Sequence, residues 1–218
     1  AKCKKKHRGK HKKKCQRRAA ELHDEALFKQ PPPRNECPIC FLPLPLDPTR
    51  TVHQSCCGKR ICSGCIHGQI ATGDCHLSCP FCRTPTHADD EELVERLKKR
   101  GEAGDAVAIY NLGLFYDRGE RGLPHNHDKA IELWLRAGGL GYAAAHCHIA
   151  IAHINGDGVE MDVKKANHYF ELAAMGGNVE SRHNLGIFEM RERDDKNRAM
   201  KHFMISACAG YDNSLTVI

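Results

Sequence analysis

Residues 37–82 read CPICFLPLPLDPTRTVHQSCCGKRICSGCIHGQIATGDCHLSCPFC and contain nine of the chain's 13 cysteines. Eight of these nine form four close pairs, namely Cys37, Cys40, Cys56, Cys57, Cys62, Cys65, Cys79 and Cys82. A two-residue spacer lets both sulfurs of a pair reach one zinc ion at about 2.3 Å. Four pairs therefore predict two tetrathiolate zinc sites. A stretch this short, with few large apolar residues, needs its two metals in order to fold.

The rest of the chain indicates an intracellular protein. The cysteine count is odd, and no apolar stretch follows the N-terminal basic run as it would in an export signal, so metal-bound thiolates are favoured over disulfides. The longest weakly polar run, residues 138–154, contains three histidines and is shorter than the ~18 apolar residues of a spanning helix. We expect a protein of the cytoplasm, the nucleus or both, with no membrane partner. Because the chain begins at Ala1, we also expect it to be a fragment.

Charge separates the N-terminal region from the rest. Residues 1–36 carry 13 Lys/Arg against 4 Asp/Glu, whereas residues 88–218 carry 16 against 21. The first 18 residues hold eleven Lys/Arg and no acid, which predicts a disordered basic arm suited to nuclear import or to non-specific nucleic-acid binding. A short helix is expected over 17–29. The sequence thus predicts an arm over 1–30 and a proline-rich spacer over 31–36.

A helix is also predicted on the C-terminal side of the cysteine block. Residues 88–101 have four acids near their start, at 89–92, and three bases near their end, at 98–100, which matches the dipole of a helix. We expect this segment to be a linker helix between a finger at 37–87 and the remaining chain.

Beyond this helix the chain repeats. Gly104, Gly141, Gly177 and Gly210 are spaced by 37, 36 and 33 residues, and a small residue follows each by four positions. An anchor alanine also recurs, with an aromatic residue four positions later, at Trp134, Phe170 and Phe203. A period of this length predicts stacked helix pairs over residues 102–218, with a fourth repeat truncated inside its first helix.

The repeated residues resemble the Sel-like repeat, a relative of the tetratricopeptide repeat. The resemblance is carried by Leu112-Gly113 to Tyr116, Gly156-Asp157-Gly158-Val159, Asp162 to Lys165-Ala166, and Ala173 to Gly177. It implies an all-α solenoid that binds other proteins through its surface.

The cysteine block, with Cys-Pro-Ile-Cys at its start and Cys-Pro-Phe-Cys-Arg at its end, resembles the RING finger. This resemblance implies a small zinc-stabilised α+β fold with cross-braced sites, one held by Cys37, Cys40, Cys62 and Cys65, the other by Cys56, Cys57, Cys79 and Cys82. The commonest RING pattern has histidine where this chain has Lys59, so the all-cysteine variant fits better. Cys56 is then expected as the eighth ligand, with His53, Cys75 and His76 as alternatives.

The RING resemblance also implies a function. RING fingers generally act as ubiquitin ligases that bind a ubiquitin-conjugating enzyme and contain no covalent catalytic residue. By resemblance, Ile39, Pro80 and Phe81 would dock that enzyme, and Arg83 would hold its ubiquitin thioester in a reactive pose. The repeats would recruit a substrate or adaptor. The alternative is a scaffold that binds proteins and has no transfer activity, which the absence of a tryptophan near Gln69 favours.

Overall fold

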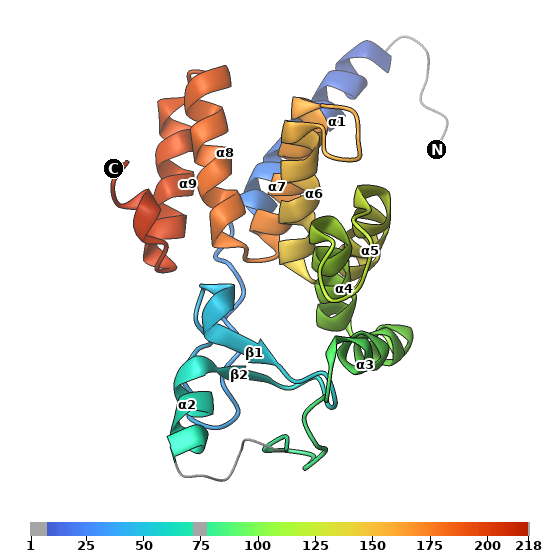
Figure 1. The fold of residues 1–218 in the computed structure, drawn as a ribbon. Helices are drawn as coiled ribbons and strands as arrows, with labels where there is room; N and C mark the ends of the chain where they lie inside the picture. Colours follow the sequence, from blue (N-terminus) through green and yellow to red (C-terminus); the bar gives the residue numbers. More distant parts are fainter. Residues whose placement is uncertain (1–7, 72–77, 218) are drawn as a thin grey trace.

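The fold consists of a small finger and a stack of helices (Figure 1). The computed structural model describes residues 8–71 and 78–217. In chain order the elements are α1 (Arg8–Leu27), η2 (Pro48–Arg50), β1 (Thr51–His53), β2 (Arg60–Cys62), α2 (Ser63–Ala71), α3 (Asp90–Glu102), α4 (Ala106–Arg118), α5 (His127–Gly139), α6 (Ala143–Asn155), α7 (Val163–Met175), α8 (Val179–Glu192), α9 (Lys196–Cys208) and η3 (Asp212–Ser214).

The expected disorder of the basic arm is wrong over the described residues, because α1 is helical from Arg8. Lysine and arginine have good helix propensity. The basic stretch continues a helix that is held at its other end by Leu27, which is only 1% exposed. Ion pairs from Arg17 and Arg18 to Glu21 add support within the helix. Residues 1–7 lie outside the described residues.

The finger is built around one short antiparallel ribbon. Strands β1 and β2 pair with Val52 opposite Ile61, and α2 follows β2 directly. Among the described residues of the finger, the buried cluster contains only Cys37, Leu44 and Ile61. This apolar core is too small to offset the conformational entropy that the surrounding loops lose on folding. The finger therefore needs further cross-links in order to fold.

Helix α3 belongs to the helical stack and is not a free linker. The Asp89 side chain caps it by accepting a hydrogen bond from the Glu92 N–H. Its residues Val94 and Leu97 are 5% and 2% exposed and lie in the same buried cluster as Ile109 of α4. Its apolar face therefore extends the solenoid core by one helix, while its charged ends behave as the sequence predicts.

Helices α4 to α9 form three antiparallel pairs, as the period predicts. A side-chain oxygen caps the N-terminus of five of them, from Asp105, Asn126, Asp162, Asn178 and Asp195.

The periodic glycines lie at the turns between repeats. All four have φ between +86° and +95°, namely Gly104, Gly141, Gly177 and Gly210. Only glycine adopts this conformation without a steric cost, which explains the spacing found in the sequence.

The recurring aromatic residues pack above small residues of the paired helix. A Cβ at Gly113 would lie 2.5 Å from Nε1 of Trp134, and a Cβ at Gly186 would lie 2.6 Å from Cε1 of Phe203. Both rings are nearly fully buried. Gly113 and Gly186 each lie nine positions after a periodic glycine, so a small residue at that position and the recurring aromatic residue form one contact between the paired helices.

The last repeat differs from the other two. Its helices are joined by residues 193–195, where Asp194 takes the left-handed φ of +51°. The chain after α9 forms the single turn η3 within the described residues, so the expected start of a fourth α-helix is wrong. The Ser214 hydroxyl is within hydrogen-bond distance, 2.9 Å, of Nδ1 of His183, so this turn covers the end of the stack.

In the described ranges 8–71 and 78–217, no helix has both the length and the apolar character needed to cross a membrane.

We predict that Gly113→Ala destabilises the chain by about 1–3 kcal/mol, because the new methyl group would overlap the Trp134 ring. Gly139→Ala is the matched control, since no atom lies within 4 Å of a Cβ built there. Urea unfolding followed by circular dichroism measures both. Equal stability for the two variants would contradict the close contact.

A second prediction concerns His202, which is 0% exposed. Burial, with help from Arg182 and Arg198 and against Asp24, lowers the pKa of His202 to about 3. Because its pKa in the unfolded chain is about 6.5, the unfolded chain binds an extra proton below that pH, and stability falls as pH falls. Between about pH 7 and about pH 5 the wild type should lose about 2 kcal/mol more than His202→Leu in urea unfolding. Parallel pH profiles would show that His202 is not buried in its neutral form.

Candidate metal centre

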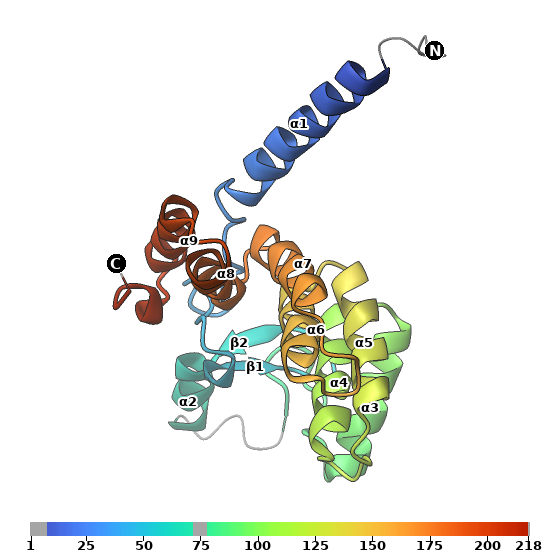
Figure 2. The same ribbon diagram turned by 90° about the horizontal axis from the view of Figure 1, so that it is seen from above.

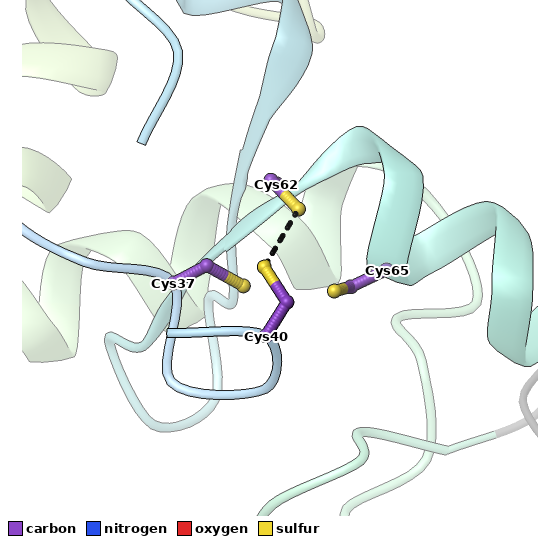
Figure 3. A group of neighbouring side chains, drawn as sticks. All are labelled: Cys37, Cys40, Cys62 and Cys65. Atoms are coloured by element: carbon purple, nitrogen blue, oxygen red, sulfur yellow. Dashed lines mark hydrogen bonds between the residues drawn. The ribbon is translucent and has the colours of Figure 1, made fainter. Parts of the chain in front are cut away.

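The structure gathers the paired cysteines into two groups of four. The sulfurs of Cys37, Cys40, Cys62 and Cys65 all lie within 4.8 Å of one another, and so do those of Cys56, Cys57, Cys79 and Cys82. Figure 3 shows the first group, with its four sulfurs pointing toward one point. The groups alternate along the chain, so the first and third pairs meet, as do the second and fourth. This is the cross-braced arrangement that the resemblance implies.

The spacing of the sulfurs fits zinc. Tetrahedral coordination at about 2.3 Å places neighbouring sulfurs about 3.8 Å apart. The distance from Cys40 Sγ to Cys62 Sγ is 3.8 Å, and that from Cys57 Sγ to Cys79 Sγ is 3.7 Å. Cys82 Sγ and Cys56 Sγ are closer, at 3.3 Å. Eight soft thiolates in two closed groups are the donors of structural zinc sites.

The first and last pairs lie in matching loops. The Cys37 N–H donates to the Leu42 carbonyl and the Phe41 N–H donates to the Cys37 carbonyl, both at 2.8 Å. In the last pair the Cys79 N–H donates to Thr84 O at 2.8 Å and the Arg83 N–H donates to Cys79 O at 3.0 Å.

The residue after the second cysteine of each loop is left-handed, with φ of +58° at Phe41 and +57° at Arg83. Loops of this kind aim both sulfurs of a pair at one side. A side chain other than glycine is uncommon in this conformation.

The surroundings lower the pKa of one thiol in each cysteine group and raise the pKa of others. Burial raises the pKa of the Cys37 thiol, but hydrogen bonds from the N–H groups of Cys40 and Cys62 outweigh it and bring the pKa to about 6. Hydrogen bonds from Thr84 lower the pKa of Cys82 to about 6. Burial and neighbouring cysteines raise the pKa of Cys65 to about 12 and raise that of Cys56. Each group thus ionises fully only when a cation compensates its charge.

For the eighth ligand, the structure distinguishes Cys56 from one of its alternatives, His53. Cys56 lies in the second group. The His53 ring faces the helical stack, with Nε2 3.2 Å from Oδ2 of Asp105. Cys75 and His76 lie outside the described residues.

Asp105 joins the second cysteine group to the first repeat. Its Oδ1 accepts hydrogen bonds from the N–H groups of Val107 and Ala108, which caps α4. Its Oδ2 accepts from Nε of Arg100 at 2.6 Å and lies beside His53, three residues before Cys56. Burial raises the pKa of Asp105, but Arg100 and the capping amides outweigh it, so the net pKa is lowered and the carboxylate stays charged. Sequence reasoning missed this contact because the aspartate reads only as a helix cap.

The residues expected to dock a partner lie around the two loops. Ile39 is partly buried and packs against the finger core, and Pro80 is also partly buried. Phe81 is 36% exposed, and Arg83 is exposed. The structure adds Phe41, which is 72% exposed and which the sequence had not singled out. The sequence could have indicated Phe41 by its position, because it follows Cys40 as Arg83 follows Cys82.

The basic residues of α1 remain exposed from His11 to Arg18. Nucleic-acid binding by this half of the helix stays a prediction.

The helical stack matches a known repeat family. The Sel1 repeat model matches residues 106–142 and 143–178, which are the pairs α4–α5 and α6–α7 with the turns that follow them. The chain therefore contains Sel1 repeats in a solenoid of the tetratricopeptide type, as the sequence predicts.

Two solved structures share this fold. A Sel1 repeat protein from Oxalobacter formigenes matches with a TM-score of 0.54 and 26% identity, over 58% of this chain and 52% of that one. The antigen c5321 of uropathogenic Escherichia coli matches with a TM-score of 0.53 and 29% identity, over 56% of this chain and 26% of that one.

Curated relatives carry the names of ubiquitin ligases or their components. The chain is 32% identical over 109 residues, half its length, to the ERAD-associated E3 ubiquitin-protein ligase component HRD3B of Arabidopsis thaliana, of which this is 17%. It is 32% identical over 111 residues, again half its length, to E3 ubiquitin-protein ligase RNF182 of Ailuropoda melanoleuca, of which this is 42%. A 67-residue match, 30% of this chain, is 37% identical to E3 ubiquitin-protein ligase GW2 of Oryza sativa, of which it is 15%. The chain thus spans less than half of each relative.

We predict two zinc ions per chain by native mass spectrometry, both released by a strong chelator together with the fold of the finger. Cys40→Ser should bind one ion fewer, because serine replaces a thiolate with a harder hydroxyl ligand. Cys208→Ser is the control, since Cys208 is exposed and lies outside both groups. Two ions in Cys40→Ser would contradict the proposed first site.

Proposed function

We propose that this chain is a zinc-binding RING-type ubiquitin-protein ligase that binds a ubiquitin-conjugating enzyme at its finger and recruits proteins through its repeats. The observation that carries the proposal is the alternating arrangement of the two four-cysteine groups. The names of the curated relatives support it independently of that geometry. The zinc ions would be structural, because every ligand position is taken by cysteine and none is open to a substrate.

Three apolar side chains around the two loops support the docking role of the finger. Ile39 directly precedes Cys40 and Pro80 directly follows Cys79, and the partly exposed ring of Phe81 adds apolar area next to Pro80. Apolar side chains held on short, cross-linked loops bind without much loss of conformational entropy. The conjugating enzyme would be recognised by these contacts.

Arg83 would orient the bound enzyme and its ubiquitin. Its side chain is exposed, and the left-handed backbone at φ +57° fixes the direction in which it leaves the loop. A guanidinium can donate hydrogen bonds to two partners at once, so it can bridge the enzyme and ubiquitin. Holding the thioester in one pose accelerates its attack by a lysine without any covalent step on the finger.

The test is ubiquitin discharge from a panel of charged conjugating enzymes in the presence of the full chain. Arg83→Asn should slow discharge about tenfold or more, as expected when a positioning contact is lost. Asparagine tolerates the left-handed conformation, so the variant changes the charge without straining the loop. Arg50→Asn, an exposed arginine elsewhere in the finger, is the matched control and should not slow discharge.

Zinc content measured on the same samples shows that the finger is intact, so the discharge rate distinguishes a ligase from a scaffold. No discharge with any enzyme, while two zinc ions remain bound, would contradict the ligase and favour the scaffold. Equal rates for Arg83→Asn and wild type would contradict the role of Arg83.

A further inference from the structure

The C-terminal end of α1 is bound in a slot between α7, α8 and α9, far along the chain from the finger. We define the α1 slot by the residues that contact this end: Glu171, Arg182, Arg198, Lys201 and His202. Figure 2 shows α1 pointing away from the rest of the molecule, with only this end near the repeats. The slot holds one helix end, while the residues from His11 to Leu22 are exposed.

Leucine is the apolar anchor of this contact. Leu27 is 1% exposed and lies in the buried cluster that contains Phe170 of α7 and Leu185 of α8. Phe28 packs on the His202 ring at 4.7 Å between centroids. The Arg198 guanidinium lies 5.0 Å and the Lys201 ammonium 5.3 Å from the centre of the Phe28 ring, within the range of cation–π attraction.

A buried arginine recognises the end of the helix itself. Arg182 is 2% exposed and donates to the carbonyl of Leu27, the last residue of α1, at 2.7 Å. Its other partner within the described residues is the Ala174 carbonyl, at 2.8 Å. Carbonyls at a helix C-terminus carry the negative end of the dipole and are not bonded within the helix. A buried guanidinium is costly without such partners, so the slot is built to be filled by a helix end.

Charged side chains add sequence preference. Asp24, three residues before Leu27, pairs with Arg198 at 2.8 Å. His23 lies 3.3 Å from Glu171. The slot thus reads an acidic residue, a leucine and a phenylalanine on the last turns of a helix.

The bound segment behaves as a tethered ligand. From His11 to Leu22 every residue of α1 is exposed, so docking depends on the last two turns. After Phe28 the chain leaves through Gln30 to the prolines, and Pro32 lies against Gly177. A ligand joined by a short tether has an effective concentration in the millimolar range, which a separate helix of matching chemistry must overcome.

We propose that the α1 slot is a site by which the repeats recruit partner proteins, and that α1 occupies it in competition with them. The partner is a protein with a helix ending in Asp/Glu-x-x-Leu-Phe. A second copy of this chain is a less favourable occupant, because α1 carries seven Lys/Arg and no acid between Arg8 and Arg18, and two such helices repel. This inference rests on the recruiting role of the repeats under the proposed function.

The test uses a fluorescent peptide with the sequence of residues 17–30, RRAAELHDEALFKQ, and the full chain. The variant Leu27→Ala/Phe28→Ala weakens the tethered ligand and should bind the peptide at least about tenfold more tightly than wild type. A peptide with alanine at the position of Leu27 should not bind either protein. Substitution in the peptide cannot unfold the chain, so this comparison isolates the anchor.

Variants in the slot locate the binding. In the Leu27→Ala/Phe28→Ala background, Lys201→Ala should weaken binding several-fold, because Lys201 lies over the Phe28 ring. Lys196→Ala, an exposed lysine at the start of the same helix, should not. If the double variant loses helical content, Asp24→Ala at a half-exposed position replaces it and should give a smaller gain in affinity.

Three results would overturn the proposal. The first is that a folded variant does not bind the peptide, and the second is that binding does not depend on the peptide leucine. The third is that light scattering shows a wild-type dimer that the Leu27→Ala/Phe28→Ala variant does not form, which would indicate exchange of α1 helices between copies. The assay contains no ubiquitin, so its failure is distinguishable from failure of the proposed ligase. Peptide binding without ubiquitin transfer would leave the slot in place on a scaffold.

Discussion

The left-handed glycine at each repeat boundary is the constraint on which the arrangement of the molecule depends. It turns the chain sharply enough for the next helix pair to pack on the previous one, and it leaves a surface without side chains at each turn. Other parts of the chain use that surface: Pro32 rests on Gly177, and Leu46 of the finger lies beside Gly210. Asp105, which follows Gly104, holds His53. The turns that shape the solenoid also hold the finger and the spacer against it.

The repeats were predictable because their determinants are local. A glycine, a small residue and an aromatic residue recur at fixed offsets, and the contacts between them form within one helix or between two consecutive helices. The finger was predictable for a related reason, since close cysteine pairs leave few ways to coordinate metal. Cross-bracing itself came from resemblance, because spacing alone permits the first pair to share an ion with the second.

What the sequence did not predict depends on contacts across long separations. Arg182 reads as an ordinary helix residue, yet it is buried and bonded to the carbonyl of Leu27, 155 residues earlier. The charge run of α1 predicts disorder, and the helix that forms there is anchored at its far end by Leu27. Helix α3 reads as a linker because its ends are charged, whereas Val94 and Leu97 complete the core of the first repeat. In each case, tertiary packing determines a structural role that the local composition does not predict.

The contact of Asp105 with His53 and Arg100 links the stability of the second cysteine group to that of the helices. The carboxylate caps the first repeat and braces the strand that leads to Cys56, so both structures use the same group. Thermodynamic reciprocity then requires that, if an ion bound at the second cysteine group stabilises the fold of α4 through this carboxylate, the fold of α4 stabilises the bound ion by the same free energy. Through that coupling, a partner that stabilises the first repeat would raise the affinity of the finger for its metal without contacting a metal ligand.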